Sequence, residues 1–192
     1  MNFTLDSVLY LSSFVWLLPP FRQFKTFVFN YFLILGIADV LVIFFNKYLQ
    51  LTFLDFYLFV SYCLFVALQK PEYLKRKKIL FLVSGLIVIV LSFIKLGIGI
   101  HIFSLSFLHL LIIFRILYLF VMKVVQRQAI NFFYLVLAFY EFTVLLKFLN
   151  FLFELKIEAQ TYFYITTGFE LLVGIFFTMF REDSPKLVYK LK

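Results

Sequence analysis

Long apolar runs separated by short polar connections make up most of the chain. A helix needs about 20 apolar residues to cross the hydrocarbon core of a bilayer, with a range of about 17–25. Seven runs qualify, near 3–20, 27–45, 53–69, 79–96, 100–122, 130–149 and 161–180. None alternates apolar and polar residues as the strands of a transmembrane barrel do. The pattern predicts an all-α integral membrane protein, a single transmembrane domain over residues 1–192 folded as a seven-transmembrane-helix bundle.

The composition supports a membrane protein over a soluble domain. Of the 192 residues, 65% are apolar and 15% are charged, and the mean hydropathy is +1.05. Soluble domains average about 45–50% apolar and about 25% charged residues. A soluble fold of this size has too little interior to bury so much apolar surface. The net charge of +8 comes from short basic clusters between apolar runs, so we expect the lipid bilayer as a partner and no nucleic acid.

Lysine and arginine residues concentrate in alternate connections. The connections after the first, third and fifth runs are basic, as is the C-terminal tail, and the densest cluster is 75–78. The other connections carry fewer basic residues, among them Lys47, Lys95 and Lys147. By the positive-inside rule, this predicts the N-terminus outside and the C-terminus in the cytoplasm. We expect a bacterial-type inner membrane or a plasma membrane.

The second and sixth runs resemble each other. Each follows an Arg-Gln pair and begins with an asparagine, and an acid follows: Asp39 comes nine residues after Asn30, and Glu141 ten residues after Asn131. A 3+1+3 parallel repeat, with the fourth helix as a linker, would explain the likeness. Chance similarity in a chain so rich in phenylalanine and leucine is the alternative.

Five ionisable residues lie deep within apolar runs: Asp39, His109, Arg115, Glu141 and Glu170. By insertion scales, a charged side chain at the centre of a membrane helix costs about 2.5–3.5 kcal/mol. Such residues therefore tend to face the protein interior, to pair, and to mark function. From a rise of about 1.5 Å per residue, these five side chains are expected to share one layer of the bundle.

The last run adds a polar stripe, because Tyr162, Thr166, Glu170, Gly174 and Thr178 recur at every fourth residue. This helix face should point into the bundle. The candidate ligand- or ion-binding residues are therefore Glu170, Glu141, Asp39, Arg115, His109 and Thr166. The alternative is structural: Arg115 pairs with one of the glutamates, and the other acids serve as hydrogen-bonding contacts between helices.

Signatures of common enzyme sites are absent from the sequence. It contains no HExxH, GxSxG, phosphate-loop or CxxC pattern. The single cysteine, Cys63, allows no intramolecular disulfide, and one thiol makes no metal site. We therefore expect no enzymatic activity, no cofactor and no metal.

Two resemblances to known families are confined to short features. The segment from Asn30 to Leu41, with Asp39 inside it, resembles the second helix of rhodopsin-like G-protein-coupled receptors. The Asp-Arg-Tyr and Asn-Pro-x-x-Tyr motifs of that family are missing, so no receptor function is carried over. The 3+1+3 order, with Pro19 and Pro20 closing the first run, is similar to SWEET and PQ-loop transporters, although the Pro-Gln dipeptide is absent.

The buried polar layer predicts a transporter-like protein that handles a small solute, a proton or a cation at a midplane site. The acids would take protons or bind cationic groups, and Arg115 would balance an anionic group. The alternative is a non-transporting membrane module, either a stand-alone seven-helix sensor or receptor, or a subunit that packs against a membrane protein partner in a larger complex.

Overall fold

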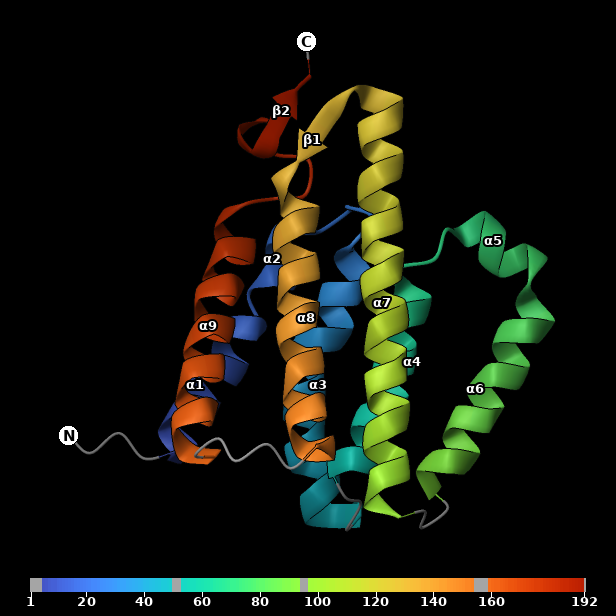
Figure 1. Cartoon of the computed structure of the whole chain (residues 1–192), viewed down its shortest axis with the longest axis vertical. Helices are drawn as coiled ribbons and strands as arrows, with labels where there is room; N and C mark the ends of the chain where they lie inside the picture. Colours follow the sequence, from blue (N-terminus) through green and yellow to red (C-terminus); the bar gives the residue numbers. More distant parts are fainter. Residues whose placement is uncertain (1–4, 50–52, 94–96, 154–158, 192) are drawn as a thin grey trace.

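The computed structural model describes residues 5–49, 53–93, 97–153 and 159–191, and these are mostly helical (Figure 1). The helices are α1 (Leu5–Trp16), α2 (Pro19–Arg22), α3 (Phe29–Leu49), α4 (Phe53–Ala67), α5 (Pro71–Arg76), α6 (Lys78–Phe93), α7 (Ile98–Arg127), α8 (Phe132–Leu152) and α9 (Ala159–Met179). A 3-10 turn, η1 (Pro185–Leu187), and two strands, β1 (Ala129–Asn131) and β2 (Val188–Lys190), complete the described elements.

Every predicted apolar run overlaps a helix, so the prediction of a helical molecule is confirmed. The short helices α2 and α5 were not predicted; each begins at a proline, which suits a first turn because the missing N–H has no partner there anyway. Two helices, α7 and α8, with 30 and 21 residues, are long and apolar enough to cross a membrane. The number of crossings and their direction stay predictions.

Helix α8 runs through the middle of the molecule, with α7 and α9 on either side (Figure 1). Helices α3 and α4 pack against each other, and α4 also packs on α7. The centre is aromatic: the buried rings of Phe32, Phe133 and Phe177 lie 4.8–6.1 Å apart between centroids. Helix α6 stands at one edge, where it packs on α4 and leaves most of its apolar side chains exposed.

Two glycines let α1 approach its neighbours closely. A Cβ atom at Gly36 of α3 would lie 2.5 Å from the carbonyl oxygen of Trp16, and one at Gly174 of α9 would lie 2.8 Å from Cγ1 of Val15. Small residues allow this kind of backbone approach between membrane helices. Trp16 is thereby held inside the bundle, with its ring 4.7 Å from that of Tyr140.

The chain after α9 folds back onto the rest of the molecule, where the sequence predicted no element. Strand β2 pairs antiparallel with β1, in the register Ile130 to Tyr189. The predicted helix over 130–149 therefore starts later, because residues 129–131 form a strand. Asn131 then caps α8, since its side-chain oxygen accepts a hydrogen bond from the N–H of Phe133 at 3.0 Å.

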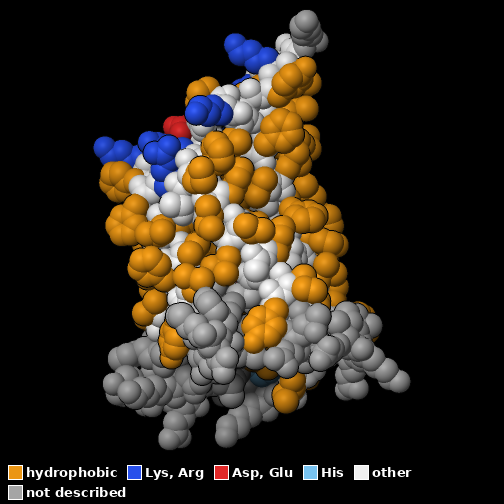
Figure 2. All heavy atoms as spheres, turned by 90° about the vertical axis from the view of Figure 1, so that its left-hand side faces the viewer, with side chains coloured by type: hydrophobic (Ala, Val, Ile, Leu, Met, Phe, Trp, Pro, Cys, Tyr) orange, Lys and Arg blue, Asp and Glu red, His pale blue; other side chains and the backbone are white. Residues whose placement is uncertain are grey.

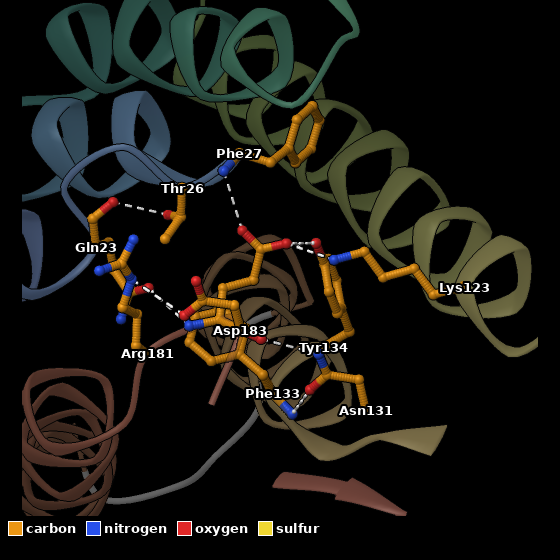
Figure 3. A network of polar contacts seen from close by, with 10 residues as sticks. Gln23, Thr26, Phe27, Lys123, Asn131, Phe133, Tyr134, Arg181 and Asp183 are labelled. Carbon is orange, nitrogen blue, oxygen red and sulfur yellow. Dashed lines mark hydrogen bonds and ion pairs between the residues drawn. The ribbon is translucent and has the colours of Figure 1, made fainter. Parts of the chain in front are cut away.

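The buried carboxylate of Glu182 anchors this tail (Figure 3). It accepts hydrogen bonds from the N–H of Phe27 at 3.1 Å, from the ammonium group of Lys123 at 2.5 Å and from the hydroxyl of Tyr134. Three parts of the chain thus meet at Glu182: the segment before α3, helix α7, and the start of α8. We refer to Gln23, Phe27, Lys123, Asn131, Tyr134 and Glu182 as the Glu182 cluster.

Gln23 completes the cluster by closing the end of α9. Its amide nitrogen donates to the carbonyl oxygens of Phe177 and Phe180 at 3.0 and 2.8 Å, and its oxygen accepts from the N–H of Glu182 at 3.0 Å. These last carbonyls have no partner within the helix. Because the carboxylate oxygens of Glu182 and the side-chain amide of Gln23 are satisfied by protein groups, the Glu182 cluster is a structural anchor.

Candidate functional site

A cavity of ≈ 400 Å³ lies among α1, α3, α4, α7, α8 and α9. Its size falls in the usual range of small-molecule sites, about 300–1,000 Å³. The residues at its edge include Tyr10 and Phe151, whose side chains are 65% and 69% exposed, so the cavity reaches the molecular surface.

Four buried side chains from four helices form a hydrogen-bonded chain, and three of them, Ser61, His109 and Glu141, line this cavity. Ser61 Oγ of α4 lies 3.0 Å from Nε2 of His109 on α7. His109 Nδ1 lies 2.6 Å from one carboxylate oxygen of Glu141 on α8. The other oxygen accepts a hydrogen bond from the hydroxyl of Tyr31 on α3. We call Ser61, His109, Glu141 and Tyr31 the polar chain.

The polar chain can exist in two states that differ by one proton, with all heavy atoms in the same positions. With a proton on Nδ1 facing Glu141, the other ring nitrogen of His109 is either protonated and donates to Ser61, or bare and accepts from the Ser61 hydroxyl. The 3.0 Å separation suits both arrangements. The pair of His109 and Glu141 is neutral in the first state and carries one negative charge in the second. Glu141 is fully buried, so this charge lies away from bulk water.

An ion pair contributes further charges to the cavity wall. The ammonium group of Lys147 lies 2.6 Å from a carboxylate oxygen of Glu170, and the two side chains are 24% and 15% exposed. Both residues line the cavity. Because the two charges compensate each other, the charge left in the wall depends on the protonation of His109.

Much of the remaining wall is aromatic. Tyr10, Trp16, Tyr57, Tyr140, Phe148 and Phe151 all line the cavity. The rings of Trp16 and Tyr140 pack 4.7 Å apart, and that of Phe148 lies 5.3 Å from the imidazole of His109. Aromatic faces carry a negative quadrupole that attracts cations.

The structure brings three of the predicted site residues, Glu141, His109 and Glu170, to this cavity. It does not bring Arg115 there. Arg115 follows His109 by six residues, which is about 9 Å along the helix and on a different side of it. Its Nε donates to the carbonyl oxygen of Leu68 at 3.0 Å, just beyond the end of α4, and its guanidinium lies 5.2 Å from the ring of Tyr118. The expectation of a single polar layer therefore does not extend to Arg115.

The other two predicted residues are Thr166 and Asp39. Thr166 is buried in α9, its hydroxyl donates to the carbonyl oxygen of Tyr162 at 2.9 Å, and it is the adjacent Thr167 that lines the cavity. Asp39 belongs to α3, but its side chain lies outside the described residues.

Sequence reasoning missed Ser61, Tyr31 and Lys147. Tyr31 and Glu141 are 110 positions apart, and Ser61 and His109 are 48 apart, so no local spacing reports these contacts. The one local signal was the polar group of Ser61 inside an apolar run. Lys147 was assigned to the outer connections by charge counting, whereas its ammonium group reaches back to Glu170.

Among the described residues, no group of three or more histidine, cysteine, aspartate or glutamate side chains is arranged to hold a metal ion. Comparison with protein-family models, with curated proteins and with solved structures finds no match to this chain. The arrangement of the cavity is therefore the starting point for its function.

Proposed function

We propose that the chain is an integral membrane protein whose seven predicted apolar runs span the bilayer, and that its cavity binds a small organic ammonium ion in exchange for a proton. The observation that carries this proposal is the buried polar chain in the wall of an aromatic-lined cavity. Transporter-like handling of the ion is the activity that such an exchange supports best.

The surface of the helices supports the membrane location. In the most apolar parts of α7 and α8, only 33% of the residues are buried within the molecule, whereas the core helix of a soluble protein is mostly buried. Large apolar side chains cover the face seen in Figure 2 along much of its length. Exposed apolar patches of this extent mark membrane or protein contact.

The distribution of charge supports the proposed orientation. In Figure 2 the visible lysine and arginine side chains gather towards the end that carries the C-terminus. The exposed basic run 75–78 spans the end of α5 and the start of α6. Basic residues favour the cytoplasmic side of a membrane, which is consistent with a cytoplasmic C-terminus.

The chemistry of the wall favours an ammonium ion over an anion. Aromatic rings bind ammonium groups through their faces. The charge of Lys147 is neutralised by Glu170. The charge of Glu141 is balanced by His109, which can lose its proton. An anion would meet this carboxylate with no unpaired cation beside it among the described lining residues.

Electrostatics then couples the ion to a proton. In a site of low dielectric constant, an uncompensated charge is costly. Without a solute, a protonated His109 balances Glu141. When an ammonium ion enters, the same carboxylate can balance its charge, and His109 releases a proton. The exchange of one bound ammonium ion for one released proton leaves the net charge of the cavity unchanged.

The order of contacts in Ser61, His109 and Glu141 also matches a Ser-His-acid catalytic triad, which makes acyl hydrolysis a second candidate. Such a reaction needs donors for the developing oxyanion, usually backbone N–H groups at a helix start or tight turn. Ser61 lies in the interior of α4, where backbone N–H groups bond within the helix. The geometry therefore favours proton exchange over acyl transfer.

A fluorophosphonate probe separates the two candidates. It forms a covalent bond with an activated serine. We expect no labelling of the folded protein at Ser61. Labelling that disappears in Ser61→Ala and in His109→Gln would establish the hydrolase and overturn the exchange proposal.

Binding is tested by thermal unfolding of the purified protein in detergent, with methylammonium and tetramethylammonium as probes. A ligand that binds the folded state raises the unfolding temperature. We expect a shift for the wild type and a weakening of affinity by about tenfold or more in Glu141→Gln. Glu72→Gln, which removes an exposed acid of α5, is the matched control and should behave as the wild type.

The absence of a shift with both ions, or an equal loss in the control, would refute the proposed ligand class. Proteoliposomes with a pH gradient then decide between transport and the non-transporting alternatives. Ammonium uptake driven by the gradient supports a transporter. Binding without uptake supports a sensor or a subunit of a larger complex.

A further inference from the structure

A second hollow, of ≈ 710 Å³, lies between α4, α6 and α7. We call it the α6 groove. Its apolar wall is formed by Phe65, Leu80, Phe81, Leu111 and Phe114, and its polar lining by Gln69, Lys70, Tyr73, Ser84, Arg115 and Tyr118. No acid is among the described residues that line it. The groove therefore joins an apolar surface to two positive charges.

Arg115 is the half-buried charge of the α6 groove. Its contacts are the bond from Nε to the carbonyl oxygen of Leu68 and the ring of Tyr118. A guanidinium has five N–H donors, and among the described residues only Nε of Arg115 has a hydrogen-bond acceptor. Among the described residues no carboxylate forms an ion pair with Arg115. A cation at this position favours an anionic ligand.

The depth of Arg115 fits an interfacial ligand. Its partner Leu68 is the residue after α4, and exposed Lys70 follows two positions later. The basic run 75–78 comes next in the chain. Arg115 thus lines the same groove as the exposed Lys70, and it lies about 9 Å nearer to the C-terminal end of α7 than His109 of the ion-exchange cavity.

We propose that the α6 groove binds an anionic phospholipid, with the phosphodiester on Arg115 and Lys70 and an acyl chain along the apolar wall. Arginine suits this role because its planar fork matches phosphate oxygens in two parallel hydrogen bonds. This inference rests on the proposed membrane location and is independent of what the cavity binds.

The apolar wall is the reason to assign a lipid and not free phosphate. Leu80 and Phe114 flank the groove and are 59% and 60% exposed. The same surface continues onto α6 with Ile79 and Leu86, which are 78% and 61% exposed. Free phosphate would leave this surface uncovered, whereas an acyl chain covers it. Basic pockets between membrane helices on the cytoplasmic side are known to hold such headgroups.

The test is lipid retention by the full-length protein in native mass spectrometry. The protein is released from detergent with added phosphatidylglycerol or phosphatidylcholine of identical acyl chains. We expect the wild type to retain phosphatidylglycerol preferentially, and Arg115→Gln to reduce that retention about tenfold. Arg22→Gln removes an exposed arginine that does not line the groove, and it should match the wild type.

A second variant and a competition experiment test the proposal further. Because Arg115 also binds a backbone carbonyl, Lys70→Gln tests the site with an exposed side chain, and it should lower retention severalfold. Equal retention of the two lipids, or an equal loss in Arg22→Gln and Arg115→Gln, would overturn the proposal. Full competition by inorganic phosphate at the concentration of the lipid would exclude a lipid ligand. Membrane fractionation, measured separately, reports on the membrane location itself.

Discussion

At the scale of single residues, two buried glutamates among the described residues have different partners. Glu182 accepts a hydrogen bond from the ammonium group of Lys123 and two further hydrogen bonds. Glu141 lies between Tyr31 and His109, neither of which must carry a charge. The first carboxylate has an ammonium group as a direct partner, whereas the second faces an imidazole. Substitution by an amide separates these two roles.

Glu182→Gln is expected to destabilise the protein strongly. The variant leaves the half-buried Lys123 without its counter-charge and turns an amide donor towards the N–H of Phe27. Removing one half of a buried ion pair costs about 3–5 kcal/mol. Thermal or denaturant unfolding in detergent measures the loss. Asp183→Asn is the control, because Asp183 pairs with Arg181 while 64% exposed, and should cost at most about 1 kcal/mol.

Glu141→Gln is expected to lower the free energy of unfolding by about 1 kcal/mol or less. The amide oxygen can still accept from Tyr31, and the amide nitrogen can donate to a neutral His109, so the hydrogen bonds of the chain are conserved. A retained fold with lost ammonium binding is the expected combination. A loss of stability as large as that of Glu182→Gln would instead identify Glu141 as a structural residue.

At the scale of elements, the packing of α1 depends on the absence of side chains at two points. Gly36→Ala should destabilise the protein by about 1–3 kcal/mol, the usual range for overpacking, because the added methyl group meets the backbone of Trp16. Gly168→Ala in α9 is the matched control, since a Cβ there has no neighbour within 4 Å. The control should be neutral or stabilising by up to about 1 kcal/mol. Equal effects of the two would contradict the packing of α1 against α3.

Elements whose pattern is local were predictable from the sequence. The apolar runs over 100–122 and 130–149 correspond to α7 and α8, with differences of a few residues at their ends. The pairing of β1 with β2 was not predictable, because it depends on contacts between Asn131 and Val188. Glu182 likewise looked like an ordinary residue of a short tail. Its role comes from three partners brought together by the fold.

The acidic residues of the site could be predicted from the sequence, but the contacts among the site residues could not. The cost of burying a charge identified Glu141 and Glu170, and it identified His109 as well. The same reasoning placed Arg115 in the same layer, because depth along a helix does not say which neighbouring helices a side chain meets. Ser61 and Tyr31 are small or aromatic residues in apolar runs, so only the three-dimensional arrangement reveals their contacts.

At the scale of the whole molecule, the proposed orientation predicts which connections face the cytoplasm. In a Cys63→Ser background, a cysteine introduced by Lys77→Cys should be protected from an impermeant maleimide in right-side-out vesicles. One introduced by Gly97→Cys, in the connection before α7, should be labelled. Both should react once the vesicles are permeabilised. The reverse labelling pattern would mean that the molecule has the opposite orientation in the membrane. Labelling of both cysteines in intact vesicles would contradict the number of crossings.

The central claim is that an ammonium ion and the proton on His109 compete to balance the charge of Glu141. The most direct measurement is the number of protons released per ion bound, obtained by titration calorimetry of the purified protein in two buffers of different ionisation enthalpy. Exchange by the polar chain predicts about one proton released with methylammonium or tetramethylammonium in the wild type and none in His109→Gln. Binding that releases no proton from the wild type would contradict the exchange.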